Sequence, residues 1–434
     1  MNVGAATSRP PTQQKGVYST NMDTVPLSLP MILDGATGTE LYKRGMPHGV
    51  CTEQWVLEHP EAILDLQRKY VQAGTQVLIA PTFGANRVNL GRHHIENKVE
   101  EYNKQLIALS RQAADGKALV AADLTGVGLF IPPFGETGFE ELVDIYTQQA
   151  RACEEAGCDL FLIETQTSLP EARAAVLAVK SVSDKPVWVT FTVDENGRTM
   201  MGTDVLAAMI VMQGMGVAAF GLNCSTGPET MLEQLERLTP YAAVPLIAKP
   251  NAGLPETVDG KTVYRCSPVE FTSHVQAMAD AGVRIFGGCC GTAPEHIAAL
   301  KQAVDAVDFD AIPDYERDLE LLPCASEKEA RFLTADVDIG EPIECSPDLM
   351  EDILDAEESG DGAIKIAIYG QDDLDIFAEN QYAIQEALCI ETDVPELLEG
   401  ALRAYQGRAL WDGTCEMEDS FLLDMSIKYG LIVL

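Results

Sequence analysis

Long hydrophobic runs and positive charge are what this sequence lacks. No apolar stretch reaches the ~18 residues of a membrane-spanning helix, and the opening residues MNVGAATSRPPTQQKG contain no apolar segment of a signal peptide. Lys and Arg number 30 against 67 Asp and Glu, which gives a formal net charge of −37. Nucleic acids and anionic membranes are polyanions, so neither is an expected partner. The sequence therefore predicts a soluble, cytoplasmic protein with no nucleic-acid and no membrane partner.

The cysteines are not arranged as in a small disulfide-rich protein. Eleven of them, an odd number, are spread through 434 residues. In a reducing cytosol this distribution favours free thiols or metal ligands over disulfides. A chain of this length also fits one large domain and a smaller one better than a single average domain.

Short apolar runs alternate with segments of helical periodicity from residue 31 to about residue 305. Because the runs are apolar almost throughout, they predict strands buried on both faces, as in a parallel sheet. The eight runs are 31–36, 76–82, 118–124, 158–165, 186–192, 218–224, 245–251 and 284–290. Eight strand–helix units of this size predict a (β/α)8 TIM barrel. A doubly wound open sheet is the alternative, and the even count of eight favours closure.

The rest of the chain divides where its composition changes. Residues 1–28 are polar and predicted to be flexible, and the barrel is predicted over 29–307. Residues 308–362 are acidic and rich in turn residues, which predicts a linker with an irregular or short helical segment. Strand–helix alternation resumes over 363–434 and predicts a small parallel α/β unit of four strands. These four apolar runs are 364–370, 387–393, 408–414 and 431–434.

Side chains that can do chemistry stand at the ends of the predicted barrel strands. Active sites of such barrels form at the carboxyl ends of the strands, where all eight ends meet. In chain order these positions hold Asp34, Thr82, Asp123, Glu164, Thr192, Cys224, Asn251, Cys289 and Cys290. The sequence therefore predicts that three thiols, three carboxylates and an amide converge at one barrel mouth.

Cys224, Cys289 and Cys290, called here the cysteine triad, come from the ends of the sixth and eighth strands. Three thiolates with a fourth position open are typical of a catalytic zinc site. The two glycines before the adjacent pair allow the backbone to bend so that both sulfurs face one ion. An adjacent pair alone is more often two buried thiols or a redox pair, and Cys224 shifts the balance to zinc. The other eight cysteines are interpreted as ordinary thiols.

Zinc held by three thiolates is a poor activator of water but suits a fourth, exogenous thiol, whose pKa it lowers. This chemistry predicts alkyl transfer to sulfur. Asp34 and Glu164 are predicted to hold a substrate ammonium, and backbone N–H groups of the loop 34–39 a carboxylate. That loop consists of Asp34, Gly35, Ala36, Thr37, Gly38 and Thr39. The predicted substrate is a thiol amino acid; rim solvation or helix capping is the alternative role of the two carboxylates.

Seven segments resemble the homocysteine S-methyltransferase family, which includes the homocysteine module of cobalamin-dependent methionine synthase and betaine–homocysteine methyltransferase. The segments are LDGATGTEL (33–41), PTFGANR (81–87), LFLIETQTSLPEA (160–172), FTVDENGRTMMGT (191–203), GLNCSTGPE (221–229), PNAGLP (250–255) and FGGCCGTAPEHI (286–297). The resemblance implies a zinc barrel with the cysteine triad as ligands. It also implies that homocysteine is held by Asp34, Glu164 and the loop 34–39, and that Asn251 supports the zinc ligands.

Residues 389–414 are similar to part of a pterin-binding barrel of the dihydropteroate synthase type. In methionine synthases such a domain follows the homocysteine barrel and binds methyltetrahydrofolate. Here four predicted strands are too few for a barrel, and Asp412 stands where an Asn is common. A docking platform for a corrinoid protein or another subunit is therefore as strong an interpretation as pterin binding.

The leading hypothesis is a zinc-dependent methyltransferase that converts homocysteine to methionine. The sequence contains no corrinoid-binding D-x-H-x-x-G motif, so any cobalamin is predicted to be carried by a separate protein, in a split methionine synthase or a corrinoid methyltransferase system. Three alternatives stay open: a small donor such as betaine or S-methylmethionine, demethylation of a methylated substrate onto a corrinoid partner, and a non-catalytic scaffold subunit. Assembly into a homo-oligomer is also left open.

Overall fold

Residues 31–305 close into a barrel. The computed structural model describes residues 28–258, 261–313, 315–360 and 362–434, so the predicted flexible segment 1–28 lies outside the described residues apart from its last one. Eight parallel strands form one sheet in the order β1-β10-β7-β6-β5-β4-β3-β2, and a parallel bridge between Leu33 and Val77 joins its two ends. The strands are β1 (Met31–Ile32), β2 (Val77–Ile79), β3 (Leu119–Leu124), β4 (Leu160–Gln166), β5 (Val187–Phe191), β6 (Ala219–Asn223), β7 (Leu246–Lys249) and β10 (Val283–Phe286). The predicted TIM barrel is confirmed.

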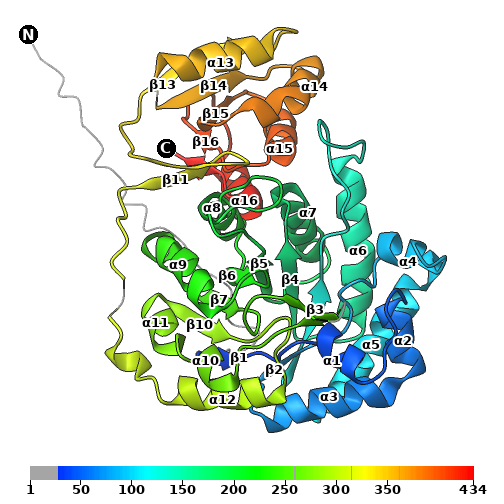
Figure 1. The fold of residues 1–434 in the computed structure, drawn as a ribbon. Coiled ribbons are helices and arrows are strands. Elements are labelled where there is room, and N and C mark those ends of the chain that lie inside the picture. The colour runs from blue at the N-terminus through cyan, green and yellow to red at the C-terminus, as the bar shows by residue number, and fades with distance from the viewer. Residues whose placement is uncertain (1–27, 259–260, 314, 361) are drawn as a thin grey trace, which may run out of the picture.

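Helices surround the barrel (Figure 1), and the side chains on both faces of its strands are buried. The helices are α1 (Gly38–Lys43), α2 (Thr52–Glu58), α3 (Pro60–Gln72), α4 (Arg87–Gly91), α5 (Val99–Ala114), α6 (Phe139–Glu155), α7 (Leu169–Lys180), α8 (Val205–Gly214), α9 (Pro228–Leu238), α10 (Pro268–Phe271), α11 (Val275–Asp280) and α12 (Pro294–Asp305). Inward residues such as Leu162, Trp188 and Ile247 fill the barrel interior, while Phe161 and Val189 pack under the helices. This double burial explains why the strands are apolar at consecutive positions.

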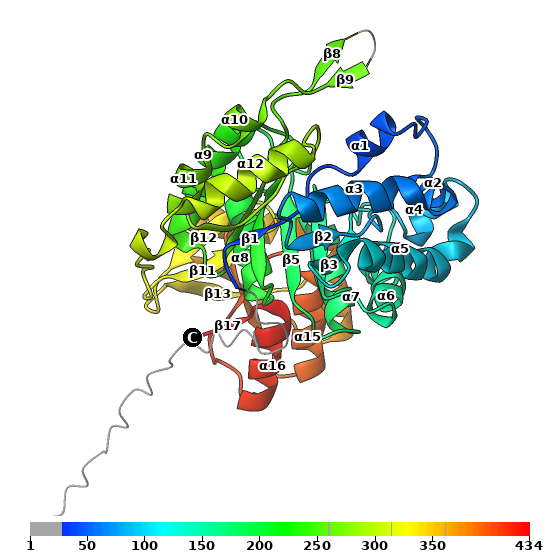
Figure 2. The same ribbon diagram turned by 90° about the horizontal axis from the view of Figure 1, so that it is seen from below.

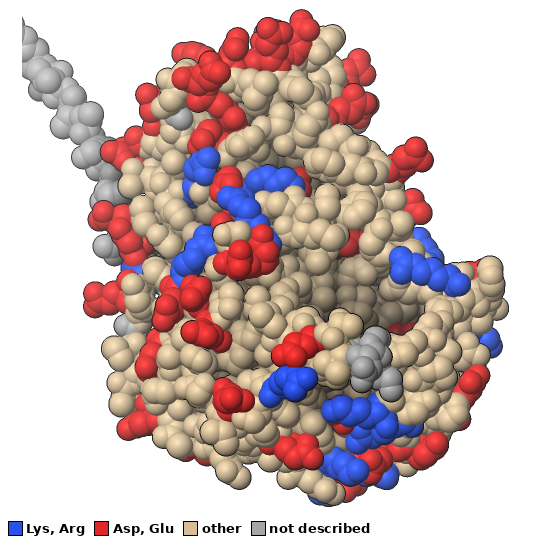
Figure 3. All heavy atoms as spheres, in the orientation of Figure 1, with Lys and Arg blue, Asp and Glu red and all other residues tan. Residues whose placement is uncertain are grey.

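A two-stranded hairpin projects from the carboxyl side of the barrel (Figure 2). It consists of β8 (Glu256–Val258) and β9 (Lys261–Val263), and follows β7 in the chain. In the view of Figure 3 the surface is hollowed over β3 and β4, at the mouth of the barrel. None of the described helices is long and apolar enough to cross a membrane.

The C-terminal unit is a second parallel sheet with five strands, where the sequence predicted four. Its strands follow the chain order: β13 (Ile339–Glu344), β14 (Ala363–Ala367), β15 (Ala387–Glu391), β16 (Leu410–Trp411) and β17 (Ile432–Val433). Its helices are α13 (Leu349–Ser359), α14 (Gln371–Asn380), α15 (Pro395–Ala404) and α16 (Asp419–Tyr429). The extra strand β13 and helix α13 lie inside the segment 308–362 that was predicted to be a linker. Because β13 is a half-exposed edge strand containing Pro342 and two glutamates, it has no apolar run to reveal it.

The same segment also contains an antiparallel hairpin, β11 (Leu322–Ala325) and β12 (Ala330–Leu333). A bridge between Ala325 and Arg408 joins it to the C-terminal unit. Its turn reaches the loop between β5 and α8: the backbone N–H of Asp204 donates to Lys328 O at 2.9 Å, and Lys328 Nζ donates to Met201 O at 2.8 Å. The predicted linker is therefore largely ordered structure that joins the two units.

Helices α7 and α8 form the barrel side of the junction with the C-terminal unit (Figure 1). Nearly every residue of both helices is buried, since one side of each faces the barrel and the other the second unit. Arg173 of α7 is fully buried and donates to Gln406 Oε1 at 2.8 Å and Leu402 O at 2.9 Å. Gly214 at the end of α8 approaches Gly430 closely enough that no side chain fits between them. The junction is thus tightly packed around buried side chains.

Candidate active site

The loops after β6 and β10 bring the cysteine triad together at the mouth of the barrel. The sulfur atoms of Cys224, Cys289 and Cys290 all lie within 4.8 Å of one another, and Cys224 Sγ lies 3.9 Å from Cys290 Sγ. All three side chains are partly exposed. These sulfurs are close enough to bind one metal ion, and no other group of three potential ligands among the described residues is.

Backbone hydrogen bonds from neighbouring loops fix the triad. The N–H of Cys224 donates to Lys249 O at 3.1 Å, and the N–H of Cys289 donates to Pro250 O at 2.9 Å. Cys224 has a φ of +62°, an uncommon conformation for a residue with a side chain. A side chain on Gly288 would lie 2.4 Å from Thr292 Oγ1, so the position before the cysteine pair requires glycine. Strand ends and glycine together impose the convergence that the sequence predicted.

Polar side chains lie around the sulfurs of the triad. Asn223 Nδ2 donates to Cys289 Sγ at 3.8 Å. The Tyr264 hydroxyl lowers the pKa of Cys290, and the Asn251 side chain lowers that of Cys224. S–H groups of the other two cysteines hold the pKa of Cys224 far below its usual range, and the same contacts raise the pKa of both partners. Without a metal ion, these contacts favour one negative charge on the cluster, carried by Cys224.

Asn223 and Tyr264 were not predicted from the sequence. Asn223 is the last residue of β6, and its side-chain oxygen accepts from the N–H of Thr165 at 3.0 Å and from Thr190 Oγ1 at 2.9 Å. Tyr264 directly follows β9 and packs against Gly291, where a Cβ would lie 2.3 Å from the tyrosine ring. Asn223 lies one position before the end of the predicted run 218–224, and Tyr264 lies outside all eight runs, so the strand-end criterion selected neither.

Asp34 follows β1 and is almost completely buried, with 1% of its surface exposed. Its Oδ2 accepts from the N–H of Ile79 at 2.9 Å, whereas its Oδ1 is buried and has no hydrogen-bond partner among the described residues. Burial raises the pKa of Asp34 to about 7, although Lys249 opposes this shift. A buried carboxylate oxygen without a partner is costly, which is typical of an atom that awaits a ligand.

The rest of the loop 34–39 is attached to the cysteine loop. The N–H of Ala36 donates to Thr292 Oγ1 at 3.0 Å, and the N–H of Gly291 donates to Thr39 Oγ1 at 3.2 Å. Gly35 has no space for a side chain, because a Cβ would lie 2.8 Å from Thr292 Oγ1 and from Tyr70 Oη. Thr37 precedes helix α1, which begins at Gly38. The predicted substrate loop and the triad therefore form one connected surface.

Glu164 in β4 forms a buried ion pair with Lys249 at the end of β7. Side-chain exposure is 3% for Lys249 and 10% for Glu164. The sequence predicted that Glu164 would hold a cation but did not identify Lys249. A lysine that ends an otherwise apolar, doubly buried strand is the signal that could have revealed it. Burial lowers the pKa of Lys249, but Glu164 and the nearby Cys289 and Asp123 raise it more, so the ammonium stays charged.

Backbone groups contact the other predicted strand-end residues, although Asp123 Oδ1 and Asn251 Oδ1 are buried without a hydrogen-bond partner among the described residues. Thr82 Oγ1 donates to Asp123 O at 2.9 Å, and Thr192 Oγ1 donates to Asn223 O at 2.9 Å. Asp123 is buried, and burial followed by the nearby Glu164 charge raises its pKa well above the usual range. Asn251 is buried, and its N–H donates to Thr226 O at 3.0 Å. These residues lie at or near the carboxyl ends of the strands, around the mouth.

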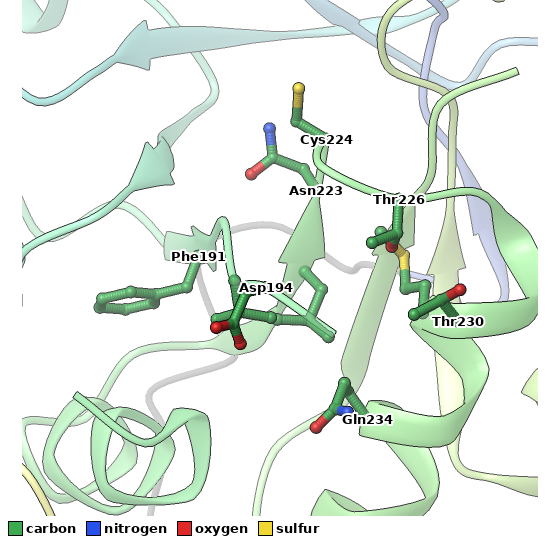
Figure 4. A pocket seen from close by; sticks show the side chains of 10 residues that line it. Phe191, Asp194, Asn223, Cys224, Thr226, Thr230 and Gln234 are labelled. Carbon is green, nitrogen blue, oxygen red and sulfur yellow. The ribbon is translucent and has the colours of Figure 1, made fainter. Parts of the chain in front are cut away.

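A small cavity of ≈ 10 Å³ lies beside Cys224 (Figure 4). It is lined by Phe191, Val193, Asp194, Leu222, Asn223, Cys224, Thr226, Thr230, Met231 and Gln234. The sulfur of Cys224 points away from Asp194 and Gln234 in Figure 4. A space of this size holds about one water molecule and is too small for a substrate. A substrate would therefore approach the sulfurs from their partly exposed side.

A family model described as homocysteine S-methyltransferase matches residues 31–304. The chain belongs to the homocysteine S-methyltransferase family. The match covers the whole barrel, from β1 to α12, and includes the cysteine triad, the two carboxylates and the loop 34–39. The resemblance found in the sequence is confirmed.

Members of this family among characterised proteins are similar over the same region. The chain is 32% identical over 316 residues to methionine synthase of Mycobacterium leprae, and 32% identical over 310 residues to that of Mycobacterium tuberculosis. These alignments cover 68% and 67% of this chain but 26% of each relative, so the chain spans about a quarter of those proteins. The homocysteine methyltransferase MmuM of Escherichia coli in its metallated form is 25% identical with a TM-score of 0.54, covering 63% of this chain and 95% of MmuM. Its apo form gives a TM-score of 0.51.

Proposed function

We propose that this protein transfers a methyl group to the thiol of homocysteine and so forms methionine. The observation that carries the proposal is the cysteine triad beside a buried carboxylate oxygen that has no partner. A thiol, an ammonium and a carboxylate are the three polar groups of homocysteine, and each has a matching feature at the barrel mouth. Membership of the family and the metallated relative support the same substrate and a metal centre.

Zinc is the metal that this donor set fits. Three thiolates favour zinc among the common divalent ions, and sulfurs within 4.8 Å of one another suit one tetrahedral ion. Cys224, Cys289 and Cys290 would hold the ion, which would lower the pKa of a bound substrate thiol. Asn223 Nδ2 donates to Cys289 Sγ, and the side chains of Tyr264 and Asn251 lower the pKa of Cys290 and Cys224.

The residues of the chain bind and orient the amino acid. Asp34 Oδ1 and the Glu164 carboxylate accept the substrate ammonium, and the loop 34–39 receives its carboxylate. The thiol proton is lost to solvent on binding. The substrate sulfur then forms a bond to the methyl carbon as the donor–methyl bond breaks, and the leaving group takes that electron pair. No general base is needed after the thiol has lost its proton, which accords with the absence of histidine from the predicted site.

The donor is proposed to be a methylated corrinoid carried by a separate protein. The C-terminal unit is proposed to be a platform for such a partner, or for a pterin. Betaine, S-methylmethionine, reversed demethylation and a scaffold role are the alternatives that experiment must exclude. A cytoplasmic location stays a prediction.

Metal analysis and a donor screen test the proposal. Purified protein is expected to contain about one zinc per chain, and Cys290→Ala to lose both zinc and methyl transfer. Cys266→Ala is the matched control, because Cys266 is partly exposed near the mouth but is not in the triad. The screen compares methylcobalamin, a corrinoid protein, betaine, S-methylmethionine and S-adenosylmethionine with homocysteine as acceptor. Full turnover by a zinc-free Cys224→Ala protein would refute the mechanism.

A further inference from the structure

Lys249 touches the candidate active site in three ways. Its ammonium pairs with the Glu164 carboxylate, and its carbonyl oxygen accepts the N–H of Cys224 at 3.1 Å. Its side-chain stem passes under the loop that carries the cysteine pair: a Cβ on Gly287 would lie 3.2 Å from Lys249 Cγ. One residue therefore connects a predicted substrate carboxylate to both loops of the triad.

Three buried carboxyl groups, Asp34, Asp123 and Glu164, lie near Lys249 at the mouth. Burial raises the pKa of Asp34 and of Asp123, which favours their neutral forms, so Lys249 and Glu164 form one balanced ion pair. A substrate ammonium next to Asp34 would favour its charged form and so find its own counter-charge in the site. Lys249 and the substrate are thus complementary rather than competing cations.

The contacts of Glu164 show how the two cations share it. Lys249 Nζ binds Glu164 Oε2, and no hydrogen bond to Oε1 is formed by any residue of the described chain. Asp34 is near enough for its charge and that of Glu164 to affect each other, and its Oδ1 is also without a partner. Holding Oε2 fixes the rotation of the carboxylate and leaves Oε1 for the ammonium.

We propose that Lys249 is a positioning residue that holds Glu164 in the orientation needed to bind the amino group of the substrate. The inference rests on the proposed homocysteine substrate and adds a residue to its recognition. Lys249 does not contact the substrate in this scheme. It acts through Glu164, and therefore governs selectivity for thiols that carry an ammonium.

Binding of two thiols to the zinc-loaded full chain tests this role by calorimetry, without knowledge of the donor. One is homocysteine, and the other is 4-sulfanylbutanoate, which is identical except that it lacks the amino group. Lys249→Met is expected to weaken homocysteine roughly tenfold to hundredfold, the range of a lost charged hydrogen bond. The affinity for 4-sulfanylbutanoate is expected to change less than threefold, because that ligand does not use Glu164.

Matched variants separate positioning from a general structural effect. Lys365→Met removes another buried lysine that is paired with carboxylates, Glu391 and Asp412, in the C-terminal unit, and should leave both affinities unchanged. Glu164→Gln should weaken homocysteine about as much as Lys249→Met, and the double variant should lose no more than either single one. If Lys249→Met does not fold, Lys249→Gln serves for the same comparison.

Two results would overturn the inference. Equal weakening of both thiols would mean that Lys249 only supports the fold or the metal ligands, and additive losses in the double variant would mean that it acts independently of Glu164. The zinc content of each variant is measured to exclude loss of the ion as the cause. If the wild-type protein binds neither thiol, the proposed function itself fails, which is a different outcome from wild-type binding that Lys249→Met leaves intact.

Discussion

Gly430 lies where the C-terminal unit meets the barrel, and replacing it by alanine tests how firmly the two are joined. A methyl group there would lie 2.9 to 3.1 Å from three backbone atoms of Gly214, at the end of α8. Gly430 also has a φ of +78°, which costs a residue with a side chain about 1–2 kcal/mol. Overpacking against a rigid backbone adds about 1–3 kcal/mol. We expect Gly430→Ala to lower the free energy of unfolding by roughly 2–5 kcal/mol.

Gly413 provides the control for this experiment, because it has a φ of +74° and no atom within 4 Å of a built Cβ. Gly413→Ala should therefore cost only the backbone strain, about 1–2 kcal/mol. Urea denaturation measures both losses, and hydrogen exchange of α8 and α16 locates them. The reasoning is refuted if Gly430→Ala is no more destabilising than Gly413→Ala, or if exchange in α8 is unchanged.

Three further perturbations address the site and its surroundings. Gly35→Ala forces a methyl group to within 2.8 Å of Thr292 Oγ1, so the affinity for homocysteine, measured by calorimetry, should fall about tenfold. Gly138→Ala is the control and should have no effect, because there is open space around Gly138. Lys328→Ala removes the hydrogen bond to Met201 O, and should speed hydrogen exchange in the loop between β5 and α8 while the rest of the barrel is unchanged. Chelation of bound metal should lower the melting temperature, since an ion at 100 times its Kd contributes about 2.7 kcal/mol; an unchanged melting temperature on chelation and zinc addition would contradict a metal site at the triad.

The barrel and the triad could be predicted from the sequence because both depend on local pattern. A strand that is buried on both faces leaves an apolar run of five or six residues, and the end of that run gives the position of its last side chain. In a closed parallel barrel every such end points to the same mouth. Cys224 and the pair at 289–290 were therefore brought together by counting strands, without knowledge of any contact.

The role of Lys249 and the strand β13 could not be predicted from the pattern of apolar residues. The strand of Lys249 was predicted. The pairing of its ammonium with Glu164, however, depends on the register between β4 and β7, which the apolar pattern of a single strand does not determine. The edge strand β13 has few buried side chains, because only one neighbour pairs with it, and its half-polar sequence is that of a loop. The pattern of apolar residues predicts which segments are buried. It does not predict segments with little burial, or which charged side chains pair with each other.

The tight junction limits how a methyl donor can reach the triad. The C-terminal unit contacts α7 and α8 through buried side chains, and its hairpin turn holds the loop between β5 and α8 at the barrel mouth. A donor bound to that unit therefore has a fixed distance to the sulfurs unless the junction opens. If opening were part of the catalytic cycle, Gly430→Ala would raise turnover as it weakens the junction. A stable junction during catalysis predicts the reverse, with turnover unchanged or lower, so the same variant distinguishes a fixed platform from a moving one.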